Sequence, residues 1–336
     1  MRESLSTAGV PMIYGDVPPF MALKYDPALT GTDVEVAVIG MPYDGLATFR
    51  GGATRRAPDE IRKYSLLFGD YNFDWDIPVL STIRAIDVGN VDVVAGDNAE
   101  SYRRFIQRLD ALSAKGIIPM SIGGDHGITY PAVDALARHQ SKPVGLVVFD
   151  THLDLSESFQ GDRLTRASPI QRICELPNVD PERVVIIGAR GPRNLPEWTP
   201  RYKALGITVF PMAQVEAQGM VAIASQALEI ASDGGQSPIY VSVDIDSVDP
   251  GFAPGTNSPE PGGLTSREII QGLRIVARNG FIGFDVVEVA PDFDSRSGTT
   301  STLAARLFAE AMACLAAIRL DRKDSWKTAH STQEAQ

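Results

Sequence analysis

The sequence has few cysteines and histidines, no excess of positive charge and no long apolar run. Its two cysteines, Cys174 and Cys314, are too few for a disulfide framework and lack the C-x-x-C spacing of a zinc-thiolate site. Both are therefore expected to be buried free thiols. The formal net charge of -11 argues against a nucleic-acid partner, because such a partner requires a basic surface.

No stretch of the chain approaches the roughly 18 uninterrupted apolar residues of a membrane span. Residues 1–11 also lack the positive start and apolar core of a signal peptide. These absences predict a cytoplasmic protein that does not associate with a membrane. The chain has 336 residues, 44% of them hydrophobic, so it is long enough to bury a large core.

Short β-branched apolar runs alternate with helical patterns along the chain. Buried parallel strands give such runs because helices cover both of their faces. The eight expected strands are Val34–Ile39, Ile83–Val88, Ile117–Ile122, Val144–Phe149, Val184–Ile187, Ile207–Phe210, Ile239–Ile245 and Ile282–Val289. The expected helices are Ala99–Lys115, Tyr130–His139, Met220–Ser232, Thr265–Arg278 and Ser301–Arg319. This alternation predicts an α/β fold with a mainly parallel sheet between two helix layers.

The chain shows no internal repeat or linker that would divide it. We expect an N-terminal extension over 1–33, a single catalytic domain over 34–320 and a polar tail over 321–336 that is frayed or used in oligomer contacts. His330, in that tail, is expected to be solvated. The loop 249–263 holds four prolines and four glycines, and a rigid loop at a strand end is expected to shape a site.

Three clusters of polar residues follow expected strands, and two of the four histidines lie in them. The clusters are Gly123–His126, Asp150–Asp154 and Ser242–Pro250. Alternate residues of an extended segment point to the same side, so Asp150, His152 and Asp154 are expected to converge. Asp244 and Asp246 are expected to do the same, and a Gly-Gly turn lets the His126 imidazole bend inward.

All three clusters lie at carboxyl ends of strands, where open parallel sheets bind their ligands. So many carboxylates cannot be buried together unless cations neutralise them. Two imidazoles and at least four carboxylates suit two divalent cations such as manganese or nickel, and such a pair turns a shared water into a nucleophile. A serine hydrolase is disfavoured, because no spare histidine lies near Ser242: His139 is expected within a helix and His330 in the tail.

These three motifs resemble the signature motifs of the ureohydrolases, which comprise arginase, agmatinase and the guanidino-acid hydrolases. The resemblance runs from about Val34 to Arg319, and the Pro-Glu-Pro-Gly-Gly stretch at 259–263 is nearer to agmatinase and guanidinobutyrase-like members. It implies a three-layer α/β/α sandwich with an eight-stranded parallel sheet, a homo-oligomer (trimer or hexamer) and a binuclear manganese or nickel site.

The resemblance also implies roles for individual residues. One metal would take His126, Asp150, Asp154 and Asp244, and the other His152, Asp150, Asp244 and Asp246, with Asp150 and Asp244 bridging. Glu288 matches the family glutamate that pairs with the substrate guanidinium. Asp154, Glu288 and Arg166 form the expected catalytic set, and Glu288, Thr256 and Arg166 the expected substrate-binding set.

The sequence departs from the family at Arg166, which stands where a histidine credited with shuttling protons is usual. Arginine does not exchange a proton near neutral pH, so water or another group protonates the leaving amine, or the leaving group needs less help. Arg166 either points to solvent or places a fixed positive charge that disfavours a cationic substrate tail and favours a carboxylate. Smaller departures, all near the expected substrate pocket, are Ala57, Thr151, Asn257 and Ser258.

The leading hypothesis is a metal-dependent amidinohydrolase. Its substrate would be agmatine, a guanidino acid, guanidine or a biguanide, and its products urea or a urea-like compound and an amine. Two alternatives remain: a weakly active or non-catalytic subunit of a hetero-oligomer with a related catalytic chain, and an unrelated binuclear phosphoesterase or amidase. The intact donor set argues against the first, and the match at all three motifs argues against the second.

Overall fold

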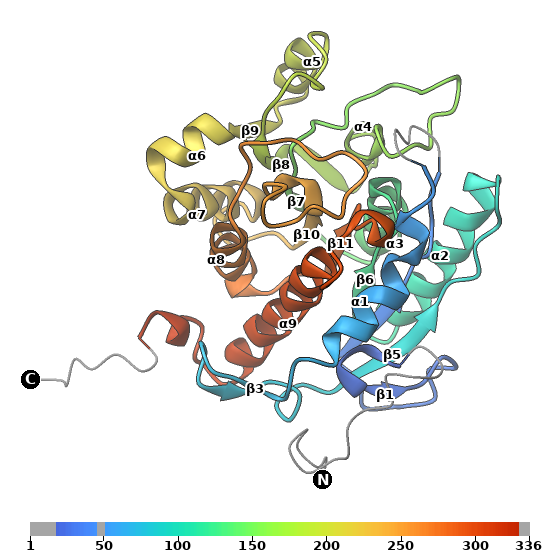
Figure 1. Cartoon of the computed structure of the whole chain (residues 1–336), viewed down its shortest axis with the longest axis vertical. Helices are drawn as coiled ribbons and strands as arrows, with labels where there is room; N and C mark the ends of the chain where they lie inside the picture. Colours follow the sequence, from blue (N-terminus) through green and yellow to red (C-terminus); the bar gives the residue numbers. More distant parts are fainter. Residues whose placement is uncertain (1–17, 46–50, 329–336) are drawn as a thin grey trace, which may run out of the picture.

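The structure is a computed structural model that describes residues 18–45 and 51–328 (Figure 1). Its main-sheet strands are β1 (Lys24–Tyr25), β2 (Val36–Gly40), β5 (Ala85–Asn90), β6 (Ile118–Ile122), β7 (Val144–Phe149), β8 (Val179–Ala189), β9 (Thr208–Pro211), β10 (Ile239–Asp244) and β11 (Gly283–Val287). A separate antiparallel pair comprises β3 (Tyr71–Asn72) and β4 (Ile77–Pro78). The expectations for residues 1–11 and His330 lie outside the described residues.

The α-helices of the described chain connect these strands and cover the sheet. They are α1 (Ala57–Ser65), α2 (Asn98–Ser113), α3 (Thr129–Ala137), α4 (Pro169–Ile173), α5 (Trp198–Leu205), α6 (Met212–Gln218), α7 (Met220–Ala231), α8 (Ser266–Val276) and α9 (Thr299–Arg319). The strand order is β1-β5-β2-β6-β11-β10-β7-β8-β9, and each neighbouring pair is parallel.

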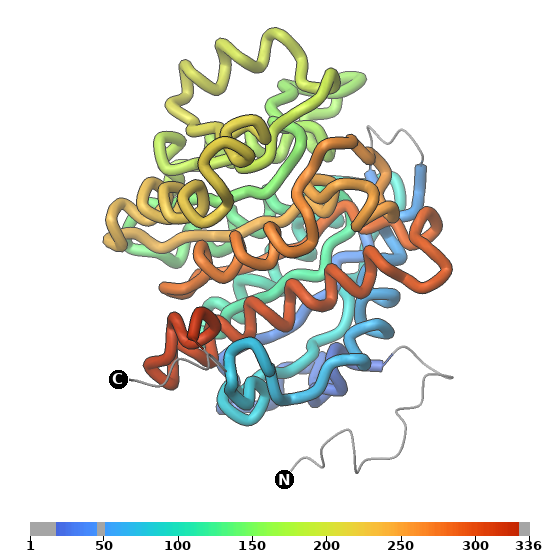
Figure 2. Tube along the Cα trace, turned by 60° about the vertical axis from the view of Figure 1, so that its left-hand side comes forward, coloured from blue at the N-terminus to red at the C-terminus, as the bar shows by residue number. Residues whose placement is uncertain are grey.

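The sheet has a hydrophobic core on each face. Along β2, Val36 and Val38 pack into one core, whereas Ala37 and Ile39 pack into the other, because successive side chains of a strand point to opposite faces. Helices α1 and α6 to α9 cover the first face, and α2 to α5 cover the second (Figures 1 and 2). The expected three-layer α/β/α sandwich is therefore confirmed.

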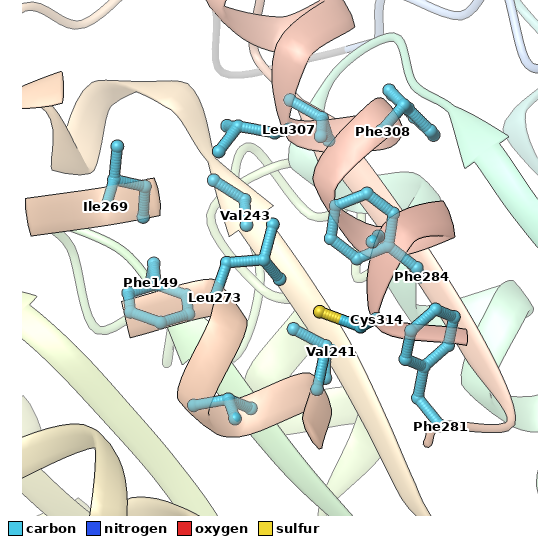
Figure 3. Packing of buried hydrophobic residues seen from close by; sticks show 14 of the residues in the cluster. Phe149, Val241, Val243, Ile269, Leu273, Phe281, Phe284, Leu307, Phe308 and Cys314 are labelled. Carbon is cyan, nitrogen blue, oxygen red and sulfur yellow. The ribbon is translucent and has the colours of Figure 1, made fainter. Parts of the chain in front are cut away.

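The first core packs side chains of the central strands against α8 and α9. In Figure 3, Val241 and Phe284 of the sheet face Leu273 of α8 and Phe308 of α9. Cys314 lies in the same core as a free thiol, as expected, whereas the second free cysteine, Cys174, is only partly buried. Neither thiol lies in the polar clusters at the strand ends.

Helix α9 is the one described helix that is long and apolar enough, by composition, to cross a membrane. Its apolar window has a mean hydropathy of 1.5, but 78% of that window is buried inside the protein. The helix packs against α1, α8 and β11, as Figure 2 shows for its long central course. A central position in the core accounts for this composition.

The sequence predicts all eight of the apolar strands, but the expected number of strands is wrong. A ninth strand, β1, adds to the edge of the sheet by pairing in parallel with β5. It consists of only two exposed residues and carries no apolar run, so periodicity does not reveal it. Helices α1, α4, α5 and α6 were also not expected. His139 lies beyond the end of α3 instead of within a helix, and it contacts Asp110.

Candidate metal centre

The candidate centre lies at the carboxyl ends of four neighbouring strands, β6, β11, β10 and β7. His126 follows β6, Glu288 follows β11, Asp244 ends β10 and Asp150 follows β7. Because these strands are parallel and adjacent, their carboxyl ends share one edge of the sheet. All six of the residues expected to ligate metal come together at this edge.

The same local turn recurs at three of these strand ends. The Oδ1 atom of an aspartate accepts the N–H of the residue two positions later: Asp150 from His152 at 2.7 Å, Asp244 from Asp246 at 2.8 Å and Asp125 from Gly127 at 2.9 Å. Such turns are characteristic of aspartate. In Asp150 and Asp244 they fix Oδ1 and leave Oδ2 directed at the first donor group, whereas Oδ2 of Asp125 accepts the Gly45 N–H.

The convergence of Asp150, His152 and Asp154 was expected from an extended backbone, and that reason is wrong. The backbone turns at Asp150, and Asp154 adopts a left-handed conformation with φ of 47°. Glu288 is also left-handed, with φ of 62°. Residues other than glycine rarely adopt this backbone conformation. Where they do, the backbone is strained, and such strain is frequent at functional sites.

The first group of donors surrounds the Nδ1 atom of His126. This atom lies 3.0 Å from Asp150 Oδ2, 2.9 Å from Asp154 Oδ2 and 3.4 Å from Asp244 Oδ2. All four side chains are buried. They supply one imidazole nitrogen and three carboxylate oxygens around a common point.

The second group surrounds the Nδ1 atom of His152. It lies 3.2 Å from Asp246 Oδ2 and 3.7 Å from Asp150 Oδ1. Asp150 thus presents one oxygen to each group, as expected of a bridging ligand. Asp244 approaches the first group, and its other oxygen accepts the Asp246 N–H.

Several donor atoms are buried and have no hydrogen-bond partner among the described residues. They are His126 Nδ1, Asp150 Oδ2 and Asp246 Oδ1. His126 Nδ1 and Asp150 Oδ2 are only 3.0 Å apart, yet they are not aligned for a hydrogen bond with each other. Buried polar atoms left in this way cost free energy, and a bound cation removes that cost. The residues therefore fit a pair of divalent cations.

Electrostatics favour the same conclusion. Burial and repulsion by neighbouring aspartates raise the pKa of Asp150 to about 7 and that of Asp244 well above its ordinary value. Burial alone would lower the pKa of the two histidines, but nearby carboxylates raise the pKa of His126 well above its usual range and that of His152 to about 10. Without cations the cluster retains protons, and cations bind by displacing them.

Arg166 is buried in this site and does not point to solvent. Its Nη1 donates to Glu288 Oε2 at 2.8 Å and its Nη2 to Asp44 Oδ1 at 2.8 Å. The other oxygen of Glu288 accepts the His126 N–H at 2.9 Å. The positive charge of Arg166 is thus already paired with carboxylates, so it is not a fixed charge open to a substrate tail.

Comparison with known proteins assigns the chain to a family. The sequence model of the Arginase family matches residues 34–314 of the chain. The chain belongs to the arginase family. Proclavaminate amidinohydrolase of Streptomyces clavuligerus is 37% identical, covering 88% of this chain and 92% of that protein. Guanidinopropionase of Pseudomonas aeruginosa is 36% identical, covering 94% and 96%.

A solved structure of an arginase-family relative agrees. Proclavaminate amidinohydrolase of Streptomyces clavuligerus matches with a TM-score of 0.83 at 35% identity, covering 90% of this chain and 98% of that one. Mitochondrial agmatinase of Gallus gallus is 34% identical, covering 85% and 82%. The chain is accordingly a metal-dependent hydrolase of amidine carbon–nitrogen bonds.

A hydroxyl network lies behind His126 in this arginase-family site, and the sequence motifs did not reveal it. Ser242 Oγ lies 3.4 Å from His126 Nε2 and donates to Asp285. Tyr240 and Thr129 also donate to Asp285, at 2.7 and 2.9 Å. Ser242 faces Asp285 across β10 and β11. Support of this kind orients a metal-binding histidine. The alternation of Tyr240, Ser242 and Asp244 along β10 was the available signal.

The loop 249–263 closes over the same edge of the sheet. Thr256 forms an isolated bridge with Val289, beside Glu288, and is fully buried. Asn257 is fully buried too, and neither its amide nitrogen nor its amide oxygen has a partner among the described residues. The substrate-binding role expected for Thr256 stays a prediction, and the structure places this residue next to the relevant glutamate.

Arg190 links this loop to the backbone at Asp246 and Ser247, and it was not identified from the sequence. Its guanidinium donates to the carbonyl oxygens of Asp246 and Ser247 at 3.0 and 3.1 Å. It also donates to the carbonyl oxygen of Pro261, at 3.2 Å. One side chain therefore joins the backbone around a metal-donor residue to the proline-rich loop. No spacing in the sequence signals a side chain that binds only backbone carbonyls.

Proposed function

We propose that this arginase-family chain uses two divalent cations, manganese or nickel, to hydrolyse a small guanidino compound to urea and an amine. The observation that carries the proposal is the pair of donor groups that share Asp150, with the Glu288 carboxylate held beside them. Two cations held by these donors would supply an activated water molecule for attack on the guanidinium carbon. Assembly into a homotrimer or homohexamer is proposed from the family resemblance alone.

The residues of the chain bind and orient the substrate. Glu288 is expected to pair with the substrate guanidinium, because an ionised carboxylate forms strong charge-assisted bonds with that cation. Its link to the His126 N–H holds the carboxylate in a fixed relation to the first donor group. Such orientation brings the reacting carbon to the point where the donors converge. Asp154 keeps its predicted role as both a metal donor and a catalytic residue.

Proton supply to the leaving amine is proposed to come from water. His126 and His152 belong to the donor groups, and His139 contacts Asp110 away from the centre. Arg166 occupies the position of the usual shuttle histidine but does not exchange protons near neutral pH. None of these side chains supplies the proton in the histidine's place, which favours water as its source.

We propose guanidino acids as the substrate class. The support lies in the relatives: guanidinopropionase at 36% identity and the human mitochondrial guanidino acid hydrolase at 34%, which covers 84% of this chain and 78% of that protein. Agmatinases at 34% and 32% identity make agmatine the comparison substrate. Arg166 does not decide between them, because its charge is paired with Glu288 and Asp44.

The test is urea release by the purified protein after separate reconstitution with manganese and nickel. The panel contains 3-guanidinopropionate, 4-guanidinobutyrate, arginine, agmatine, guanidine and a biguanide. We expect turnover of a guanidino acid, loss of turnover in Glu288→Gln and retention in Glu182→Gln, a matched change at an exposed glutamate. Absence of urea from all six compounds with metal bound would contradict the proposal and favour a chain that needs a catalytic partner. The comparisons give no support to that alternative.

A further inference from the structure

Three carboxylates surround the guanidinium of Arg166. Glu288 Oε2 and Asp44 Oδ1 each lie 2.8 Å from it, and Asp125 Oδ2 lies 3.4 Å away. The three carboxylate side chains are at most 5% exposed, and the arginine side chain is 7% exposed. One guanidinium therefore lies among three buried carboxylates.

The carboxylates are positioned by bonds that do not involve Arg166. Asp125 accepts the backbone N–H groups of Gly45 at 2.6 Å and Gly127 at 2.9 Å. Glu288 accepts the His126 N–H through Oε1. Loss of the arginine side chain would thus leave a preformed pocket whose shape and charge match a planar cation.

A guanidinium binds a carboxylate most strongly through both of its oxygens, and both oxygens of Glu288 are already hydrogen-bonded. Its Oε1 is bonded to the His126 N–H, and its Oε2 is bonded to Arg166. In the proposed function the substrate guanidinium also pairs with Glu288. The arginine of the chain and the guanidinium of the substrate therefore compete for the same carboxylate.

We propose that Glu288, Asp125 and Asp44 form a guanidinium-binding site, which Arg166 fills in the ligand-free protein and from which the substrate displaces it. The inference rests on the proposed function for the identity of the displacing ligand. Exchange of one guanidinium for another at Glu288 leaves this carboxylate paired with a cation. Substrate binding then avoids the cost of burying an unpaired charge.

The contacts of Arg166 allow this exchange. Its Nε is buried without a hydrogen-bond partner among the described residues, so the internal pairing is incomplete. Asp44 also belongs to the wall of a cavity of about 710 Å³ that carries two more carboxylates, Asp97 and Asp162. Arg166 can keep its contact with Asp44 while it releases Glu288, and its charge remains among acidic groups.

Competition makes Arg166 a specificity-determining residue. When Arg166 occupies the site most of the time, the apparent affinity for a ligand equals its intrinsic affinity multiplied by the fraction of molecules in which the site is empty. A monosubstituted guanidinium can offer Glu288 two parallel N–H groups. A guanidinium that carries alkyl groups on the edge facing Glu288 lacks one of these N–H groups. Arg166 therefore raises KM for all guanidino substrates and excludes most strongly those with a blocked N–H edge.

The binding test uses the manganese-reconstituted protein and guanidinium chloride as the probe. Arg166→Met keeps most of the side-chain volume and removes the guanidinium, and Arg163→Met is the matched control at an exposed arginine of the same loop. We expect calorimetry to show at least about tenfold tighter guanidinium binding in Arg166→Met than in the wild type or the control. Addition of Glu288→Gln should abolish that gain. Equal binding by wild type and Arg166→Met would overturn the proposal.

The kinetic test uses whichever guanidino compound releases urea. KM should fall about tenfold or more in Arg166→Met, and by a larger factor than kcat changes. A rise in KM would show that Arg166 holds the substrate and would overturn the proposal. If Arg166→Met fails to fold, Arg166→Gln serves in both tests. Absence of urea from every compound would overturn the proposed function, and the guanidinium-binding test would still decide the present inference.

Discussion

Two regions of the molecule bury clusters of carboxylates, and they solve the resulting electrostatic problem differently. In the candidate metal centre, the ion-pair partners of Asp150 among the described residues are two histidines, His126 and His152. Between α8 and α9, by contrast, the fully buried Glu310 accepts hydrogen bonds from Arg274, Arg306 and Trp75. The carboxylate of Glu310 is thus paired with arginines of the chain itself. The aspartates of the metal centre have no arginine or lysine partner among the described ion pairs.

The pKa values express this difference. Burial would raise the pKa of Glu310, but hydrogen bonds and charge from Arg274, with help from Arg306, bring it to about 2. Burial and neighbouring aspartates raise the pKa of Asp150 to about 7. A buried carboxylate that is paired with arginine thus belongs to the scaffold. One surrounded by other carboxylates and unpaired donor atoms indicates an external cation.

The cluster around Arg166 lies between these cases. It has an arginine, as the Glu310 cluster does, but one guanidinium serves three carboxylates. In the Glu310 cluster, two arginines serve Glu310 and Asp74. Among the described contacts, the two clusters therefore differ in how many carboxylates each arginine contacts. The predictions below test that difference.

The largest effect is expected from Asp150→Asn, which removes the carboxylate shared by both donor groups. Urea release should fall by about a thousandfold or more, because the water-activating cations lose a common ligand. Manganese is expected to raise the melting temperature of the wild type but not that of Asp150→Asn. Metal titration by calorimetry and melting curves check both effects. Retained activity would remove Asp150 from the centre.

Glu310→Ala should chiefly damage stability. It leaves Arg274 largely buried without its main partner, and such changes cost about 3–5 kcal/mol in the free energy of unfolding. Denaturant titration measures the loss. The remaining folded protein should bind metal as the wild type does, because none of the described hydrogen-bond partners of Glu310 is a metal donor. A matching loss of metal affinity would contradict the separation of the two clusters.

The pH dependence of stability should differ between the metal-free and metal-loaded protein. In the metal-free protein the pKa of Asp150 is raised from 3.8 to about 7 and that of His152 from 6.5 to about 10. The folded state then holds more protons than the unfolded chain, so stability falls as pH rises, between about 4 and 7 for Asp150 and between about 6.5 and 10 for His152.

The expected fall is on the order of a few kcal/mol between about pH 6 and pH 9. Bound cations should offset it, because the deprotonated donors are the ones that bind metal. Chemical denaturation at a series of pH values, with and without manganese, gives the comparison. Parallel curves for the two forms would mean that the shifted groups do not hold the metal.

The smallest effect is expected from Ser242→Ala. This change removes the hydroxyl that links His126 to Asp285 but leaves every metal donor in place. Metal affinity should fall by about 10- to 100-fold, as for other groups that orient a metal-binding histidine. Ser225→Ala, on the exposed face of α7, is the control. Unchanged metal affinity in Ser242→Ala would show that His126 is held by packing alone.

The parts of the site that the sequence predicted are those set by strand ends. Asp150 and Asp244 stand directly at the ends of strongly apolar strands, and adjacent parallel strands bring such ends together. The positions of His152 and Asp154 depend instead on a local turn and a left-handed residue. Backbone turns of that kind leave little trace in side-chain periodicity, so the right convergence was expected for a partly wrong reason.

Long-range polar contacts account for what the sequence did not reveal. The burial of Arg166 depends on Asp44, 122 residues away in the chain, and on Glu288, 122 residues in the other direction. A single sequence carries no signal for such pairs. Strand β1 was missed for a related reason, since its pairing with β5 depends on backbone hydrogen bonds and not on an apolar pattern.

The left-handed backbone at Glu288 means that the residue best for stability and the residue best for activity differ at this position. Glycine adopts such a conformation without the steric penalty that a side chain incurs, so Glu288→Gly would ease the backbone while it removes the carboxylate. A variant library sorted only for heat resistance should therefore drift toward glycine or asparagine at this position. The same library sorted for turnover should keep glutamate. The difference in thermal stability between the variants from the two sorts would measure the stability that the protein loses by having glutamate there.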